Sequence, residues 1–215
     1  PVTVVTQLGE RSQVVLPDGT KVWLNSSSSV EYVAPFFSRQ RRVKMEGEAY
    51  FEVEHDARRP FVVVTGQVVS TVLGTTFNVH AYSEDENYQI TLATGSLLVD
   101  GGPESRSVRL RPGEQGFFEK TSGLLSLRRV NVEHVLSWQE DRLYFRAEPL
   151  ASIARSLERQ FNVDITIPDE RLRRICFTGE FVEGENIHEI MRIISADSRI
   201  LCRSRKNHFE LYRNR

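Results

Sequence analysis

Strict alternation of side-chain character between Val43 and Val53 limits the folds open to this chain. Apolar residues or glycine occupy every second position, and the positions between them carry Lys44, three glutamates and Tyr50. Successive side chains of a strand point to opposite faces, so the segment is predicted to be a strand with one face in a core and one in water. Gly47 predicts a bend or bulge within it.

The period of two extends over residues 1–130, and turn signals separate the short apolar segments. Pro17-Asp18-Gly19 is a typical turn, because proline presets φ and glycine accepts a positive φ. Short strands at such spacing predict a mainly β domain over 1–130, arranged as a β-sandwich, a barrel or a β-solenoid-like fold.

After Trp138 the hydrophobic period changes from that of strands to that of helices. Leu150, Ile153, Ala154, Leu157 and Phe161 predict one amphipathic helix. A capping box of Asn186 and Glu189 predicts the start of a second helix. Short strand patterns before, between and after them give the order β-α-β-β-α-β-β. The sequence therefore predicts an α+β domain over 142–215, joined to the first domain by a connector at 131–141.

Composition excludes several classes of function. The 215 residues carry a net charge of −1, which argues against nucleic-acid binding and against contact with anionic lipid. No apolar run reaches the length of a membrane helix, and a chain beginning at Pro1 is expected to be a soluble piece of a longer protein. Cys176 and Cys202 could form a disulfide or remain two buried free thiols.

Catalytic and metal-binding patterns are missing from the sequence. The five histidines lack the spacing of a zinc site, and no nucleophile elbow or phosphate loop occurs. We therefore predict no catalytic residues, no metal and no cofactor. The basic run Arg39–Arg42 is interpreted as a solvated approach to a strand or as a contact for an acidic partner. Two other functions stay open, a cupin-like or carbohydrate-active enzyme on a β scaffold and a structural envelope adhesin.

Several long phrases resemble the FecR family of anti-sigma factors. They are Gly9–Ser12, Val15–Thr20, Val22–Asn25, Gly47–Val53, Arg59–Phe61, Val72–Val79 and Leu110–Gln115. Residues 142–212 resemble the small domain that follows in FecR proteins of the Bacteroidetes type, which is similar to the short N-terminal signalling domain of secretins and TonB-dependent receptors. Asp141 departs from the family, which usually has glycine there.

The resemblance implies the periplasmic part of a single-pass inner-membrane regulator. Its implied partner is the periplasmic signalling domain of a TonB-dependent outer-membrane receptor. It implies control of an extracytoplasmic-function sigma factor in the cytoplasm through a segment that this sequence does not contain.

The α+β domain is the expected place of receptor contact, since two similar small sheets can join through main-chain hydrogen bonds. We predict that the terminal strand lies at a sheet edge and binds the receptor. Its residues are His208, Phe209, Glu210, Leu211 and Tyr212.

Overall fold

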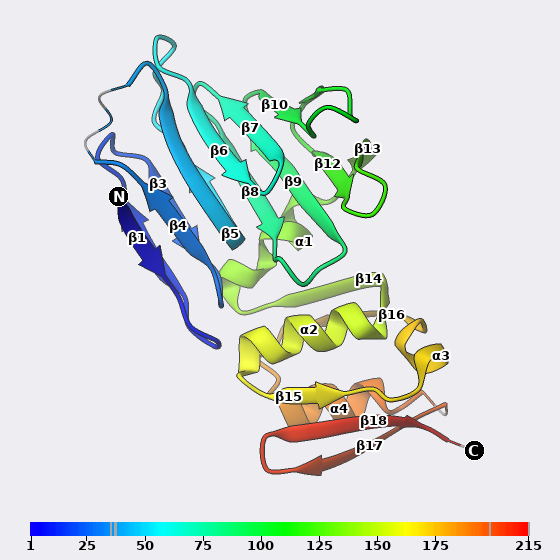
Figure 1. Cartoon of the computed structure of the whole chain (residues 1–215). Helices are drawn as coiled ribbons and strands as arrows, with labels where there is room; N and C mark the ends of the chain where they lie inside the picture. The colour runs from blue at the N-terminus through cyan, green and yellow to red at the C-terminus, as the bar shows by residue number, and fades with distance from the viewer. Residues whose placement is uncertain (35, 37, 198, 215) are drawn as a thin grey trace. The chain divides into compact units, whose positions relative to one another are not determined.

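A computed structural model describes the chain apart from residues 35, 37, 198 and 215 (Figure 1). The chain divides into two compact units, Pro1–Leu136 and Ser137–Arg215. The expected connector at 131–141 is split between them.

The first unit consists of thirteen strands within its described residues, followed by a short helix, α1 (Val132–Leu136). The strands are β1 (Val2–Val5), β2 (Ser12–Val15), β3 (Lys21–Leu24), β4 (Ser29–Tyr32), β5 (Arg41–Glu52), β6 (Phe61–Thr65), β7 (Val68–Val72), β8 (Thr76–Ala81), β9 (Asn87–Thr94), β10 (Leu97–Asp100), β11 (Val108–Leu110), β12 (Glu114–Glu119) and β13 (Leu124–Arg129).

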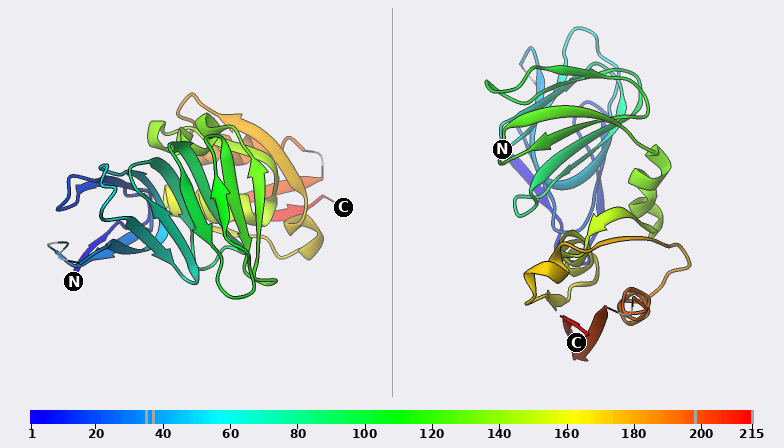
Figure 2. Two further views of the ribbon diagram at one scale, coloured as in Figure 1. Left: turned by 90° about the horizontal axis from the view of Figure 1, so that it is seen from above. Right: turned by 90° about the vertical axis from the view of Figure 1, so that its right-hand side faces the viewer.

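Strand β5, which contains the alternating segment, belongs to two sheets at once. Its first half pairs with β4 and β6, and its second half pairs with β3 and β8. One sheet has the order β1-β4-β5-β6-β7-β10-β11 and the other has the order β2-β3-β5-β8-β9-β12-β13. Figures 1 and 2 show the resulting curved sheet folding over on itself.

Gly47 lies where β5 passes from one sheet to the other, and its φ of +95° is one that other residues rarely adopt. A Cβ atom there would lie 2.3 Å from Ser28 Oγ and 2.7 Å from Ser28 Cα. The predicted bend at Gly47 is confirmed, and the close approach of Ser28 explains why no side chain fits.

A single apolar core fills the space between the two sheets. The inward face of β5 contributes Val43, Met45, Ala49 and Phe51, and the Phe51 ring stacks on Phe77 with centroids 5.0 Å apart. The sandwich is close to a barrel, because β11 at the end of one sheet contacts β12 and β13 of the other. The prediction of a mainly β first part is confirmed.

The second unit has two small sheets and three α-helices within its described residues. Its elements are η1 (Ser137–Glu140), β14 (Leu143–Pro149), α2 (Leu150–Phe161), β15 (Asp164–Thr166), α3 (Glu170–Arg173), β16 (Cys176–Phe181), α4 (Ile187–Ile194), β17 (Ile200–Arg205) and β18 (His208–Arg213). The predicted order is confirmed with one addition, the single-turn helix α3, which is too short to produce a periodic pattern.

Helix α2 contacts both sheets of this unit, β14 on one side and β15 on the other (Figure 1). Strands β14 and β16 form a two-stranded sheet, and the other sheet has the order β15-β18-β17. The apolar faces of α2 and α4 supply buried Ile153, Leu157, Ile190 and Ile194 to one core. Burial of the apolar face of α2 explains why this helix is predictable from its hydrophobic period.

Two local features of this unit follow from the sequence. The capping box is present, since the Asn186 side chain accepts from the backbone of Glu189 while the Glu189 side chain accepts from the backbone of Asn186. Asp141 has a φ of +59°, which aspartate tolerates better than most side chains. The turn can therefore form at Asp141 without the glycine that the resemblance leads us to expect there.

Candidate functional site

The strand predicted to bind a partner is the central strand of its sheet. Strand β18 pairs in parallel with β15 and antiparallel with β17, so the prediction of an edge strand at 208–212 is wrong. Both of its main-chain sides are occupied, and Phe209 and Leu211 are fully buried beneath the helices. The sequence shows that β17 and β18 form a hairpin, but not that β15 adds to its far side.

The two edges of this sheet differ in how far they are closed. At the β15 edge, the Ile165 N–H donates to Glu158 Oε1 of α2 at 2.7 Å. Ile165 is the middle residue of β15. In a parallel pair, alternate residues of a strand direct their N–H and C=O groups toward the partner strand, so those of Ile165 point away from β18 when Asp164 and Thr166 bond to it. The Glu158 carboxylate therefore occupies the donor that an added strand would need.

The β17 edge has no such covering group within the described residues. Arg205 and His208 flank a two-residue turn, so they form a hydrogen-bonded pair. In an antiparallel hairpin such pairs recur at every second residue along each strand. Asn214 N–H donates to Arg199 O at 3.1 Å, in the same register. Cys202 and Ser204 therefore direct their N–H and C=O groups away from β18, toward the open edge.

Side chains on the outer face of the hairpin combine charge with apolar surface. Arg203 forms an ion pair with Glu210, with Nη2 and Oε2 2.6 Å apart, and its guanidinium lies 5.5 Å from the Tyr212 ring centroid. Leu201 is 37% exposed beside them. The continuous pairing of β17 with β18 keeps the hairpin extended, which is the geometry that strand addition requires.

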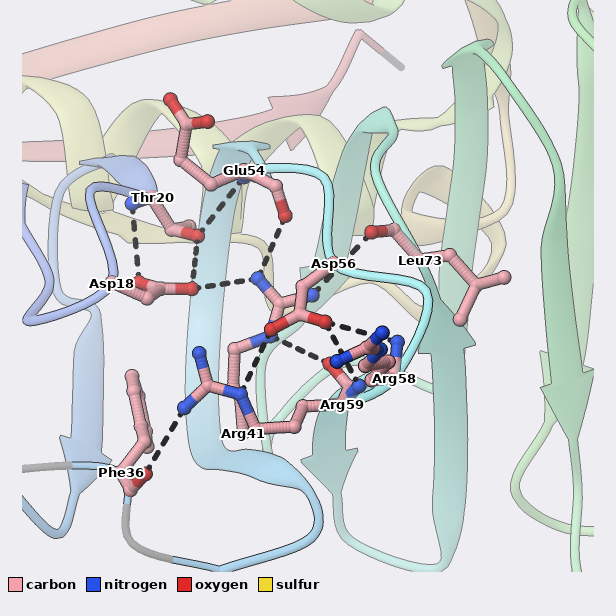
Figure 3. A network of polar contacts seen from close by, with 9 residues as sticks. All are labelled: Asp18, Thr20, Phe36, Arg41, Glu54, Asp56, Arg58, Arg59 and Leu73. Atoms are coloured by element: carbon pink, nitrogen blue, oxygen red, sulfur yellow. Dashed lines mark hydrogen bonds and ion pairs between the residues drawn. The ribbon is translucent and has the colours of Figure 1, made fainter.

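A buried polar cluster in the first unit surrounds Arg41, at the start of β5 (Figure 3). Its guanidinium donates to Asp18 Oδ2 at 2.8 Å, to the carbonyl of Glu54 at 2.7 Å, to that of Arg59 at 2.8 Å and to that of Leu73 at 3.4 Å. The residue is fully buried. Arg41 thus joins three separate segments: the turn at Asp18, the β5–β6 loop that contains Glu54 and Arg59, and the β7–β8 turn at Leu73.

The neighbouring residues complete the cluster and show that its role is structural. Asp18 also accepts from the Thr20 backbone and hydroxyl, and the Thr20 hydroxyl accepts from Glu54 N–H. Asp56 accepts from Arg59 and fixes that loop. The hypothesis that the whole 39–42 run is solvated or contacts a partner is wrong for Arg41. The sequence contained a signal for the burial of Arg41, because this residue has an odd number, like the apolar residues on the buried face of β5.

A second polar cluster lies around His80 of β8. Its Nδ1 is 3.5 Å from Glu48 Oε2, and its Nε2 is 2.9 Å from Asp85 Oδ2. Burial alone would lower the pKa of His80, but the Glu48 charge and the bonds to Asp85 and Glu48 raise it to about 9. Burial would raise the pKa of Glu48, but His80 and donated bonds from Asn78 and Asn25 lower it. The cluster is an imidazolium held between two carboxylates.

The described part of the structure contains no metal-binding cluster. Across the described residues, no three side chains of His, Cys, Asp or Glu come together in a way that could hold a metal ion. Cys176 and Cys202 are free thiols on strands of different sheets. The expectation that both would be buried if unpaired is wrong, because Cys176 is exposed and Cys202 is partly buried. Burial raises the pKa of the Cys202 thiol. In the described part of the chain no helix has the length and hydropathy needed to cross a membrane.

The described residues thus form a β-sandwich and a small α+β unit with one open strand edge. Comparison with known proteins gives its family. The profile of the FecR protein family matches residues 2–98, and that of the FecR C-terminal domain matches residues 142–211. No match was found among curated proteins.

Two solved structures resemble the entire chain. Both are crystal structures of a protein from Parabacteroides distasonis ATCC 8503 that is described as a putative anti-sigma factor, one at 1.65 Å and one at 2.50 Å resolution. Both are 34% identical to this chain and cover all of it, with TM-scores of 0.94 and 0.93 and with 100% and 99% of their own chains covered. This chain belongs to the FecR family of anti-sigma factors.

Proposed function

We propose that this chain is the periplasmic relay region of a transmembrane anti-sigma factor. It receives the state of an outer-membrane TonB-dependent transporter and controls an extracytoplasmic-function sigma factor through a cytoplasmic segment outside this chain. Family membership supports the regulatory part of this proposal. The chain acts as a binding module and carries out no catalysis.

The open edge of β17 is the observation that carries the choice of contact site. The receptor's periplasmic signalling domain adds a strand there, with main-chain hydrogen bonds to Cys202 and Ser204. Leu201 and Arg203 beside the edge provide side-chain selectivity. The site therefore shifts from the predicted strand 208–212 to the other strand of the same hairpin.

Ser204→Pro tests this contact. It removes an outward N–H and leaves the hydrogen bonds between β17 and β18 in place, because Ser204 is not in a hydrogen-bonded pair. We expect the variant to stay folded and to bind the purified receptor signalling domain at least about tenfold more weakly by calorimetry, which is about 1.4 kcal/mol. Ser204→Ala is the matched control, since it removes the hydroxyl and keeps the main-chain N–H.

Wild-type affinity in a folded Ser204→Pro variant would exclude the β17 edge. Equal weakening by Ser204→Ala would assign the effect to the hydroxyl instead of the main chain. In cells that carry the full-length regulator, Ser204→Pro is expected to uncouple transporter occupancy from sigma-dependent transcription. Saturable one-to-one binding to the receptor domain also separates this function from that of an adhesin.

A further inference from the structure

A small basic pocket lies at one end of the second unit, between α3 and the end of the β17–β18 hairpin. Arg171 and Leu172 of α3, Ile175 before β16, and Arg199 and Arg213 at the ends of the two hairpin strands line it. Its volume is about 180 Å³. Three arginine side chains and two aliphatic side chains thus line the pocket.

The three arginines of the pocket differ in whether an ion pair within the protein neutralises their charge. Arg199 pairs with Asp197, with Nη2 and Oδ2 2.6 Å apart. Within the described residues, the side chains of Arg171 and Arg213 have no carboxylate partner. The neighbouring Arg173, which does not line the pocket, is paired with Glu170. Two of the three arginines that line the pocket are therefore not neutralised by a carboxylate of the described residues.

The size of the pocket restricts what can occupy it. A cavity of about 150 Å³ holds one benzene molecule, whereas sites for drug-sized ligands and cofactors occupy about 300–1,000 Å³. A volume of about 180 Å³ fits one aliphatic or aromatic side chain. Leu172 and Ile175 are the aliphatic residues that line the pocket, and Ile175 is the more exposed of the two.

We propose that this pocket binds an apolar side chain flanked by carboxylates, in an acidic segment of a partner protein. The apolar side chain enters between Leu172 and Ile175, and the flanking carboxylates pair with Arg171 and Arg213. Guanidinium groups suit this role because they bind carboxylates in bidentate geometry. A buried apolar anchor with charges at its rim is also the usual form of an interface hot spot. The contact uses side chains alone and does not depend on strand addition at β17.

The test uses residues 1–215 and the peptide acetyl-Gly-Asp-Asp-Leu-Glu-Glu-Gly-amide as probe. Methyl NMR is expected to show saturable shifts at Leu172 and Ile175. Three further probes separate the possible ligands: the peptide with glycine in place of leucine, the peptide with Asn and Gln in place of Asp and Glu, and hexanoate. We expect each altered peptide to bind at least about tenfold more weakly than the parent.

Arg171→Glu combined with Arg213→Glu is expected to weaken binding of the parent peptide by at least about tenfold. Arg173→Glu, the matched control on the same helical turn, is expected to change it less than about threefold. If the double variant loses the native methyl spectrum, Arg171→Gln with Arg213→Gln replaces it, and the same loss of binding is expected.

Four results would overturn the proposal. No saturable shift with the parent peptide would mean that the pocket is not a site. Equal binding of the glycine peptide would mean attraction by charge alone, and an equal loss in Arg173→Glu would mean a diffuse basic surface. Saturation by hexanoate at a lower concentration than by the peptide would identify a small aliphatic acid as the ligand.

Discussion

Replacement of Arg41 by methionine is expected to destabilise the first unit strongly. Methionine fills much of the same volume but donates no hydrogen bonds. The Asp18 carboxylate then stays buried with only Thr20 as donor, and the carbonyls of Glu54 and Arg59 lose the guanidinium. Removing one member of a buried ion pair costs about 3–5 kcal/mol, and each orphaned buried acceptor costs about 1–3 kcal/mol. We expect a loss of at least about 3 kcal/mol.

The double variant Arg41→Met with Asp18→Asn separates the ion pair from the carbonyl contacts. Neutralising Asp18 removes the isolated charge, so the double variant is expected to be more stable than Arg41→Met alone. It does not regain wild-type stability, because the carbonyls of Glu54 and Arg59 still lack their donor. We expect the free energy of unfolding of the double variant to stay about 1–3 kcal/mol below that of wild type, which is the contribution of the carbonyl contacts.

Urea unfolding followed by the fluorescence of Trp23 measures these effects. A Trp138→Phe background restricts the signal to the first unit, which matters because a chain of two units need not unfold in one step. Arg42→Met is the control, since Arg42 is exposed on the same strand and should stay within about 0.5 kcal/mol of wild type. A loss below about 1 kcal/mol for Arg41→Met would refute the structural role assigned to this residue.

Three further predictions concern other contacts. Because the pKa of His80 is raised from 6.5 to about 9, the stabilisation by charged His80 is complete below pH 6.5 and is lost as pH rises toward 9. Urea unfolding at several pH values should show this fall in stability, and a His80→Gln variant should lack it. Gly47→Ala should lower the free energy of unfolding by more than about 2 kcal/mol, because of the positive φ and the clash with Ser28. A second change, Ser28→Ala, should not restore stability, because the Cα atom of residue 28 also clashes; a restored stability would contradict this reasoning. Glu158→Ala should expose the Ile165 N–H, which faster hydrogen exchange at that amide would report, while an unchanged rate would mean that the carboxylate does not cover this edge.

Local pattern determined much of the architecture. The alternation around Val43 predicted β5 because one face of that strand is buried, and period two is the pattern that such burial imposes. The apolar stripe of α2 and the capping box of α4 likewise depend on residues close in sequence. The phrases around Gly47 and Gly74 resemble the FecR family and lie within the residues that its profile matches. Both glycines have little room around them, since a Cβ on Gly74 would lie 2.6 Å from His55 Nδ1.

Strand neighbours and buried charges were decided only by the tertiary structure. Strand β18 is central because β15, from far earlier in the chain, pairs with its free side, and no local pattern specifies which strand a βα unit will join. Arginine is usually a surface residue, yet the fold places three carbonyls from two separate connections around Arg41. The open edge of β17 and the basic pocket beside α3 arise in the same way. Hydrophobic periodicity records whether a residue is buried, whereas the identity of its neighbours depends on how distant segments are brought together.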